Sequence, residues 1–541
     1  MESAPGSRQL NPAERSGFAA RLRGLLCRDQ WHWALFVAIL ALGVFARTWE
    51  FRTLPPGMVA DEVSIGVDAY DLYHFGMDHN GISWPVHFVS FGSGQNALYG
   101  YLLIPFVALL GLTPAVVRLP MLISGILTLP LVYWIARKSF HNGLGLLAMF
   151  FVAISPWHIM LSRFGLESNF FVFLFLLAYA CILASIADGR WFYPACIFFA
   201  LCFFNYGPAY LIVPVFLINA IWLLRRQGNL RLGHMVGGLL LLLALSLPMV
   251  AYLLVNALGK SSIQIGPVTI PQLPEQARFL SQTSGFQTDP LETLLGNAWT
   301  LTKLLFLQTD GLIYNAFEPY GYFYKITFPI AIAGVALLVA RQARNFDTKI
   351  GIFLGWPAAC ILFGILQPVN INRINVVFIA ILLCAAIAVD WLAKRVRYVL
   401  PIAVALLLIA FGFFTADYHG AAYARAADFK FHAELMQAVR AAAVEPDGPV
   451  CMTNRIDMPY IYVLFVEKPG PQSYLGDIQY TYPGPGTRYV RSMGRYIFGK
   501  GNCSPDPRTI YLLRFDDGRP RTGTRYNVQR FGDFSVYMPQ P

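Results

Sequence analysis

The chain contains few charged residues. Aspartate, glutamate, lysine and arginine make up only 13% of its 541 residues, about half of the roughly 25% found in soluble domains. Hydrophobic residues reach 56%, and many of them occur in runs close to the length that crosses a bilayer. The scarcity of charge excludes a single water-soluble globule and makes the membrane the main solvent of this chain.

Several signatures of common protein classes are also missing. The sequence has no Gly-rich phosphate-binding loop, no Cys/His spacing typical of a zinc site and no internal repeat. The net charge of +11 comes from short basic clusters between apolar runs, so we expect no nucleic-acid partner. A lipid or solute transporter is the main alternative to an enzyme, and the lack of repeats argues against it.

The first 30 residues carry five arginines but no apolar core and no small-residue cleavage site. We therefore expect residues 1–30 to form a cytoplasmic tail and not a removable signal peptide. Further basic clusters occur along the chain, and each is expected on the cytoplasmic side. They are Arg137 and Lys138; Arg190; Arg225, Arg226 and Arg231; Arg341, Arg344 and Lys349; and Lys394, Arg395 and Arg397.

Placing all these clusters on one side predicts an α-helical polytopic protein with about eleven spans, ending outside. The expected spans are residues 31–48, 116–136, 143–158, 168–187, 191–204, 208–224, 235–257, 326–341, 350–366, 374–392 and 398–415. The apolar piece 98–111 is short and broken by Pro105, and it then has to be re-entrant or interfacial. If it crosses instead, the count becomes twelve and four basic clusters lie outside.

Three regions are expected outside the membrane, namely the loops 49–115 and 258–325 and a domain at 417–541, with residues 31–415 forming the membrane module. The last region alternates a helix-like stretch, Ala424–Val444, with strand-like runs at Tyr460–Val466 and Thr509–Leu513, which predicts a small α/β domain. Its two cysteines, Cys451 and Cys503, form a disulfide if the compartment is oxidising and the geometry allows it.

Acidic residues follow the first span. Asp61 and Glu62 are adjacent there, and Asp68, Asp71, Asp78 and His79 follow them. Burial and mutual repulsion near the interface can raise a carboxyl pKa and prepare a base, whereas the plainer interpretation is a solvated acidic loop.

A second carboxylate, Glu167, is expected at the same membrane surface, four residues after Arg163. The two side chains either pair with each other on one helix face or contribute to a polar site. Arg373, beside Asn372, enters the tenth expected span and should either snorkel or face a polar cavity. The loop before the eighth span adds Asp310 and Glu318.

Taken in order, these segments resemble the polytopic glycosyltransferases of the C superfamily. The likeness is to the family 39 group, which includes protein O-mannosyltransferases and lipid A aminoarabinose transferases, and it covers most of residues 31–415. The segments are Asp61-Glu62; Leu98-Tyr-Gly-Tyr-Leu with Ile104-Pro105; Gly111-Leu-Thr-Pro-Ala-Val-Val-Arg118-Leu-Pro120; Ser155-Pro-Trp-His158; Ser162-Arg163 with Glu167; and Asn372-Arg373.

The resemblance implies transfer of a sugar from a polyprenyl-phosphate carrier to an acceptor hydroxyl outside the cytoplasmic (inner) membrane, with inversion at the anomeric carbon. The acceptor is then a lipid, a protein or a glycan. Asp61 matches the family's general base, Glu62 its acidic neighbour and Glu167 the position of a second carboxylate. The leaving phosphate needs cations, and Arg163 and Arg373 are the candidates. A non-catalytic relative that only binds the carrier lipid is a further alternative.

The chain departs from the family just before Leu98. Relatives carry a Lys-Pro-Pro or similar run there, whereas this sequence has Gly94-Gln95-Asn96-Ala97, so Gln95 and Asn96 stand where a basic contact to the donor phosphate is expected. Metal use stays open. Asp61, Glu62 and Glu167 offer oxygen ligands for a divalent cation, but their spacing defines no ligand set.

Overall fold

The computed structural model describes residues 12–274, 290–444, 448–484, 487–504, 506–520 and 523–540. Residues 1–11 of the predicted tail and residues 275–289 of the predicted second outer loop lie outside these ranges. The rest of the predicted tail is helical, because α1 runs without a break from Pro12 to Thr48. The part of α1 at Gln30–Thr48 is long and apolar enough to span a membrane, as the sequence predicts.

Nine helices of the described chain have the length and apolar composition of a membrane span. Besides α1 they are α4 (Pro114–Ser139), α7 (Glu167–Ser185), α9 (Ala209–Arg226), α10 (Leu232–Ala257), α13 (Thr327–Arg344), α14 (Thr348–Leu366), α16 (Val376–Ala393) and α17 (Val399–Tyr418). Each corresponds to one predicted span, and the protein is a multi-pass membrane protein. The other two predicted spans are shorter helices, α5 (Asn142–Ala153), which is followed by α6 (Pro156–Leu161), and α8 (Phe192–Asn205).

The apolar piece that interrupts the first outer loop is a separate helix, α3 (Leu98–Leu110). At about 1.5 Å per residue its 13 residues extend roughly 20 Å, which is shorter than the hydrocarbon core. The hydroxyl of Tyr99 at its start donates to the carbonyl of Val117 near the start of α4 (2.8 Å). The segment therefore begins close to where the next span begins, as expected for a piece that does not cross.

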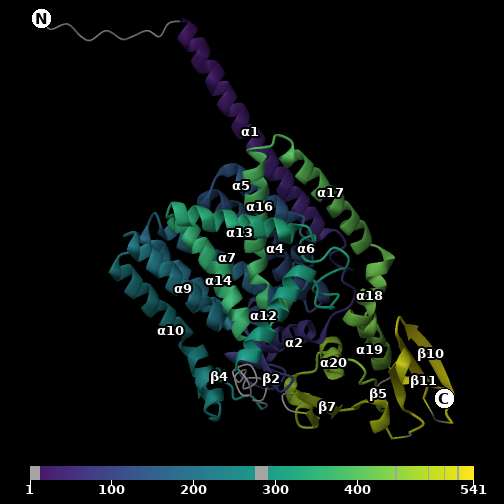
Figure 1. Ribbon diagram of the computed structural model, residues 1–541. Coiled ribbons are helices and arrows are strands. Elements are labelled where there is room, and N and C mark those ends of the chain that lie inside the picture. The colour runs from purple at the N-terminus through teal and green to yellow at the C-terminus, as the bar shows by residue number, and fades with distance from the viewer. Residues whose placement is uncertain are drawn as a thin grey trace, which may run out of the picture.

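The two ends of the helix bundle differ in charge. At one end, which we call the basic end, the ammonium of Lys349 donates to the carbonyl of Lys138 (2.9 Å), and Asp390 contacts both His141 and Lys394. Three predicted basic clusters thus lie together, which agrees with the predicted parity of the spans. The opposite end, the loop end, carries α2 (Ala60–Phe75), the hairpin formed by β3 (Ile263–Ile265) and β4 (Val268–Ile270), and the C-terminal sheet (Figure 1).

Two short hairpins belong to the loop end. In the first, β1 (His87–Ser90) pairs antiparallel with β2 (Ser93–Asn96), and its turn residues Phe91 and Gly92 both have positive φ. This backbone is that of a two-residue turn matched to the strand twist, and the glycine tolerates it at no cost. In the second, β3 (Ile263–Ile265) pairs with β4 (Val268–Ile270). After the second hairpin, α12 (Pro290–Leu307) packs against α14.

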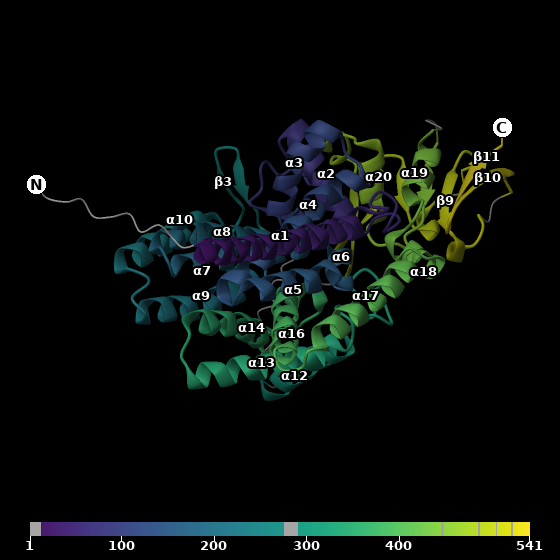
Figure 2. The ribbon, with the colours of Figure 1, turned by 90° about the horizontal axis from the view of Figure 1, so that it is seen from above.

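The C-terminal region follows α17 through α18 (Ala421–Phe431) and α19 (Leu435–Ala443) and forms a seven-stranded sheet of order β10-β11-β9-β5-β8-β7-β6. Strand β5 is parallel to both β8 and β9, and the other pairs are antiparallel. Figure 2 shows this sheet beside α18 and α19, on the side of the bundle away from α10. The remaining elements are β5 (Val450–Met452), α20 (Pro459–Glu467), α21 (Pro471–Tyr474), β6 (Gln479–Gly484), β7 (Thr487–Met493), β8 (Tyr496–Phe498), β9 (Ile510–Arg514), β10 (Tyr526–Phe531) and β11 (Phe534–Pro539).

The structure corrects two local predictions in this region. The apolar run at Tyr460–Val466 is the helix α20 and not a strand, because Pro459 starts a helix whose residues are buried on nearly all sides. A fully buried run shows no periodicity that separates the two states. The stretch 424–444 is two helices, broken where His432 and Glu434 take positive φ. Strand β9 confirms the prediction at Thr509–Leu513, and Cys451 and Cys503 form a disulfide with their Cα atoms 6.0 Å apart.

Candidate active site

The first turn of α2 presents two carboxylates with opposite environments. Asp61 is exposed, whereas Glu62 is fully buried. Glu62 accepts two hydrogen bonds from the guanidinium of Arg118 (Nε–Oε1 and Nη2–Oε2, both 2.8 Å) and one from the backbone N–H of Gly165 (2.9 Å). The pairing is bidentate and fully desolvated, so Glu62 is an acceptor whose hydrogen-bonding capacity is already used.

Arg118 is in turn held by the chain that leads into α2. Its two terminal nitrogens donate to the carbonyls of Pro55 and Gly57 (2.8 and 2.7 Å). The pair thus joins α2, α4 and the turn before α7 at one point. In this arrangement Glu62 fixes the helix turn that displays Asp61. A direct part of Glu62 in proton removal would require its release from Arg118.

Glu167 lies in the first turn of α7 and contacts the first hairpin. The side-chain amide of Gln95, on β2, donates to the Glu167 carboxylate (Nε2–Oε2 3.2 Å), and Asn205 donates to its backbone carbonyl (2.6 Å). Asn96 anchors the same strand to the carbonyl of Phe203 and to the hydroxyl of Tyr210 (both 3.2 Å). Gln95 and Asn96, which stand where relatives carry a basic run, therefore bring the hairpin to Glu167.

The carboxylates of Glu62 and Glu167 both lie near Tyr99. Burial raises the pKa of Tyr99 well above its ordinary value, and the negative charges of Glu62 and Glu167 add to that rise. Tyr99 stands at the start of α3, so α2, α3 and α7 converge where these two charges meet. Glu62 and Glu167, which are far apart in the sequence, therefore both lie near Tyr99 at the loop end.

The loop between α12 and α13 closes another side of this region. Burial raises the pKa of Tyr314 to about 12, with further contributions from the charges of Asp310, Asp61 and Asp457. Asp310 accepts hydrogen bonds from the side chain of Asn315 (2.8 Å) and the backbone of Leu312 (3.0 Å), and burial raises its pKa. Asp310 and Asp61 therefore act on one tyrosine, while Glu318 lies exposed further along the same loop.

The two predicted phosphate-binding arginines are placed differently. Arg163 is fully buried, and its guanidinium donates to the carbonyls of Ala46, Trp49 and Leu54, where α1 ends. It also lies over the ring of Tyr418 at 5.5 Å. It does not form the predicted alternative pair with Glu167, and contact with a donor phosphate would require it to leave these carbonyls.

Arg373 is partly exposed, and it belongs to the short helix α15 (Ile371–Ile374). The side chain of Asn370 caps this helix, and Arg373 donates to the carbonyl of Pro368 (2.8 Å). The next turn is tied to the head of α7, because Asn375 donates to the carbonyl of Ser168 (3.1 Å). Asn372 and Arg373 therefore lie close to the turn that carries Glu167.

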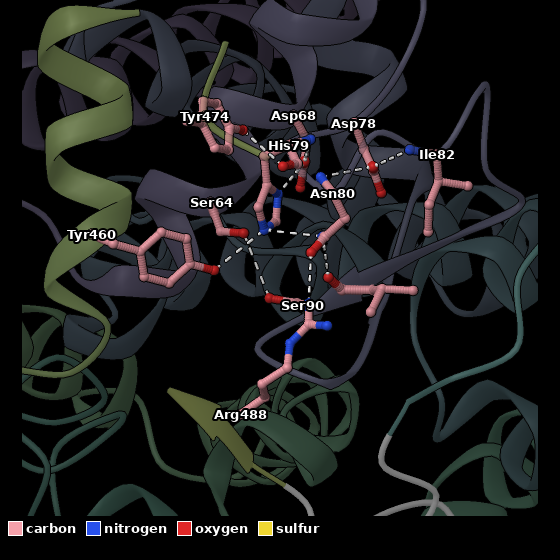
Figure 3. A network of polar contacts seen from close by, with 11 residues as sticks. Ser64, Asp68, Asp78, His79, Asn80, Ile82, Ser90, Tyr460, Tyr474 and Arg488 are labelled. Atoms are coloured by element: carbon pink, nitrogen blue, oxygen red, sulfur yellow. Dashed lines mark hydrogen bonds and ion pairs between the residues drawn. The ribbon is translucent and has the colours of Figure 1, made fainter. Parts of the chain in front are cut away.

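Asp68 and Asp78 of the first loop belong to a buried network of polar contacts beside the hairpin (Figure 3). His79 pairs with Asp68 (2.6 Å), and its backbone carbonyl accepts from the hydroxyl of Tyr474 (2.7 Å). Asn80 joins the carbonyl of Val89 (2.6 Å) to the guanidinium of Arg488 (2.9 Å). The network binds the first loop to the C-terminal region and supports the strand that leads to Gln95.

The stability of this network depends on pH. Burial raises the pKa of Asp71 to about 8 and that of Asp78 to about 7, and repulsion from Asp68 adds to both. Burial alone would lower the pKa of His79, but the attraction of Asp68 outweighs it and raises that pKa. Between about pH 4 and 8 the folded state therefore binds more protons than the unfolded chain, so the network loses stability as the pH rises.

The acidic groups do not form an evident metal site. Among the described residues, no three His, Cys, Asp or Glu side chains are close enough together to hold an ion. We derive no step through a divalent cation.

Known proteins match this arrangement in part. The profile of the dolichyl-phosphate-mannose-protein mannosyltransferase family matches residues 96–252, which include Arg118, Arg163 and Glu167. Among curated proteins, no sequence matches the chain significantly. The solved structure of ArnT from Cupriavidus metallidurans bound to undecaprenyl phosphate is 15% identical, with a TM-score of 0.55, over 93% of this chain and 97% of that one. The chain has the glycosyltransferase C fold.

A second solved structure shares the glycosyltransferase C fold with this chain. It is the oligosaccharyltransferase AglB from Archaeoglobus fulgidus in complex with an inhibitory peptide and a dolichol-phosphate, 14% identical with a TM-score of 0.51. The match covers 81% of this chain and only 64% of the archaeal protein. In this glycosyltransferase C fold, α2 and the hairpin β1–β2 lie at the loop end of the bundle, where the candidate residues gather.

Sequence reasoning missed three residues of the site. Arg118 was noted only as part of a motif, although an arginine inside an apolar run signals a buried partner. Tyr314 and Asp457 carry no such signal, because they lie in a distant loop and in the segment after β5, and only the fold brings the charges of Asp61 and Asp457 to bear on the pKa of Tyr314.

Proposed function

We propose that the protein is an inverting glycosyltransferase, which moves a sugar from a polyprenyl-phosphate carrier to an acceptor hydroxyl, with Asp61 as general base. The observation that supports this most is the contrast within the first turn of α2. Glu62 is neutralised and locked by Arg118 and Gly165, whereas the neighbouring Asp61 carboxylate is exposed at the loop end. A rigidly held, accessible carboxylate is what a base for an incoming hydroxyl requires.

The proposed step is a single displacement. The acceptor oxygen forms a bond to the anomeric carbon while the bond from that carbon to the phosphate oxygen breaks. The hydroxyl proton passes to Asp61, and the carrier leaves as polyprenyl phosphate. An acceptor hydroxyl is a poor nucleophile at neutral pH, and a positioned base accelerates such attack by roughly 10²–10⁴-fold.

The leaving phosphate gains negative charge, so it needs donors on the side of the carrier lipid. Arg373 is the cation we assign to it, because it is partly exposed beside the head of α7. Arg163 is better suited to positioning, since its guanidinium holds the end of α1. Gln95 stands where relatives carry a basic residue, and it already contacts Glu167. We therefore assign Gln95 and Glu167 to hydrogen bonds with the hydroxyl groups of the sugar.

The location follows from the donor and from the thiol chemistry. We place the basic end in the cytoplasm and the loop end outside the inner membrane, in accordance with the distribution of lysine and arginine. The disulfide between Cys451 and Cys503 supports this orientation, because such bonds persist in oxidising compartments. A long prenyl chain then lies among the apolar helices, and its phosphate and sugar reach the loop end.

The test uses the full-length protein in lipid nanodiscs with a radiolabelled pool of undecaprenyl-phosphate sugars and a membrane extract as acceptor. Released undecaprenyl phosphate measures transfer. We expect the Asp61→Asn variant to lose roughly 10²–10⁴-fold in turnover while it still binds the carrier. The control variant Asp477→Asn changes an exposed carboxylate of the C-terminal region, and it should keep full turnover.

Two results count against the proposal. Wild-type turnover in the Asp61→Asn variant removes that residue from the role of base. In sealed proteoliposomes loaded with the same donor pool, movement of intact carrier-linked sugar across the bilayer without release of lipid phosphate identifies a transporter instead.

A further inference from the structure

The C-terminal sheet contains a crevice at the ends of its parallel strands. The chain leaves β5, reaches β8 on one side of it, and then returns to β9 on the other side. Residues that follow the three strands therefore meet at one edge of the sheet. In open α/β sheets, ligands bind in the crevice beyond the carboxyl ends of the strands at such a reversal of strand order.

A cavity of about 770 Å³ lies at this edge, within the usual range of small-molecule sites. It is lined by Asn454, Arg455, Lys500, Gly501, Arg514 and Asp517. Asn454 and Arg455 follow β5, Lys500 and Gly501 follow β8, and Arg514 ends β9. Three cations and one carboxylate face the same cavity.

The ion pairs around the cavity leave it positively charged. Arg514 pairs with Asp516 (2.6 Å), and the Nε of Arg455 lies 3.3 Å from Asp517. The ammonium of Lys500 donates instead to backbone carbonyls, those of Asp517, Gly518 and Arg519. These carbonyls fix Lys500 in place without cancelling its charge, so the lining keeps one uncompensated positive charge.

The turn that carries Lys500 is built for close approach. Gly499 has a φ of +94°, and its N–H donates to the carbonyl of Met452 at the end of β5 (2.7 Å). A Cβ at this position would come within 2.8 Å of the side-chain nitrogen of Asn454. Glycine therefore lets the turn pack against the Asn454 amide, which can both donate to and accept from a hydroxyl group.

The segment after β5 leads from the crevice toward Asp61. Arg455 lines the cavity, and Asp457 follows two residues later. Burial first, and then the charges of Asp457, Glu62 and Asp61, raise the pKa of Tyr462 on α20. Asp457 and Asp61 also act together on Tyr314. The hydroxyl of Tyr462 donates to the carbonyl of Met58 (3.0 Å), and α20 packs against α2. The helix that follows Arg455 therefore contacts the element that carries Asp61.

We propose that this crevice binds an anionic sugar, one that carries a phosphate or a carboxylate, as part of the acceptor. Arg455 and Lys500 face the acidic group, and the amide of Asn454 faces sugar hydroxyls. Only the assignment of the bound sugar to the acceptor rests on the proposed function. The binding itself is independent of the donor lipid, and it can be measured without any transfer.

The experiment measures binding of glucose 6-phosphate and of glucuronic acid to the full-length protein in nanodiscs by saturation-transfer NMR, with glucose as the uncharged control. We expect at least one charged sugar to bind more tightly than glucose and to be displaced by salt. Binding of the phosphate or of the carboxylate probe tells which acid the crevice prefers.

Variants locate the binding. Arg455→Gln should weaken it by about tenfold to a hundredfold, because a hydrogen bond to a charged group is lost. Arg455 is 56% exposed, so its pair with Asp517 contributes little to folding. Arg455→Lys should restore part of the binding. Arg491→Gln, an exposed arginine on β7, should leave it unchanged.

The outcomes separate the two proposals. Charged sugars that bind no better than glucose, or that bind Arg455→Gln as tightly as the wild type, overturn the anionic site. Binding that survives in the Asp61→Asn variant supports the site whether or not that variant transfers sugar. A protein that binds the charged sugars but releases lipid phosphate from no donor keeps the site and loses the proposed function.

Discussion

The pair between Glu62 and Arg118 allows a quantitative test of how the candidate site is held. In Glu62→Gln the shape is kept, but the amide has one oxygen for three donors, two on Arg118 and one on Gly165. One donor of Arg118 then faces the new NH₂ group, and the buried guanidinium loses its counter-charge. Removing one partner of a buried pair costs about 3–5 kcal/mol, so we expect a loss of that size in the free energy of unfolding.

The double variant Glu62→Leu/Arg118→Leu refines the estimate. It removes both charges but leaves the carbonyls of Pro55 and Gly57 and the N–H of Gly165 without these partners. Each unsatisfied group costs about 1–3 kcal/mol. The double variant should therefore be less stable than the wild type. Its loss in the free energy of unfolding should still be smaller, by at least about 1 kcal/mol, than the sum of the losses in the single variants Glu62→Leu and Arg118→Leu.

Equilibrium unfolding in mixed detergent micelles, followed by tryptophan fluorescence, measures these differences. Asp61→Asn is the matched control, because it removes a carboxylate from the adjacent, exposed position. We expect it to unfold like the wild type although it loses turnover. The reasoning is refuted if Glu62→Gln is as stable as the wild type, or if Asp61→Asn is the less stable of the two.

Three further predictions concern other parts of the molecule. Hydrogen-exchange protection factors in the segment 68–80, corrected for the intrinsic pH dependence of amide exchange, should fall as the pH rises from 5 to 9, because protonated Asp71 and charged His79 stabilise the fold, and Asp71→Asn should flatten that profile. Arg373→Gln should lower transfer by at least about tenfold through loss of a charged hydrogen bond, and Arg373→Lys should recover part of it, as release of lipid phosphate will report. A reporter fused after His141 should read cytoplasmic, and an outside signal would reverse the assignment of the basic end.

The spans could be predicted because a helix that crosses the bilayer needs a minimum length of mostly apolar residues, and such runs are visible in the sequence. Nine of the predicted spans coincide with helices that, among the described residues, are long and apolar enough to cross a membrane. Parity also placed Asp61 and Glu167 at one end. The signal weakens for short buried pieces: the apolar run at Tyr460–Val466 predicts a strand, but it forms the helix α20, which is buried on nearly all sides and so shows no clear periodicity.

The roles of individual side chains were harder to predict. The partner of Glu62 lies 56 positions away, and the carbonyls that hold Arg163 lie more than 100 positions away. Charge alone could suggest that such residues belong to a site, but only the packed chain shows which charges are already used. Of the predicted charged residues, Asp61 and Glu318 are exposed and Arg373 is partly exposed, whereas Glu62 and Arg163 are fully buried.

The contact of Arg488 with the first hairpin has a consequence for engineering. Its backbone N–H donates to the carbonyl of Phe91 at the hairpin tip (2.9 Å), while its guanidinium donates to Asn80 (2.9 Å). Strand β7 and the loop that ends in Gln95 are thus joined by hydrogen bonds although they lie far apart in the sequence. A chimera in which the C-terminal sheet is exchanged at the end of α17 therefore also needs the hairpin β1–β2 of the donor protein. The hairpin and the sheet contact each other and do not keep their shape separately.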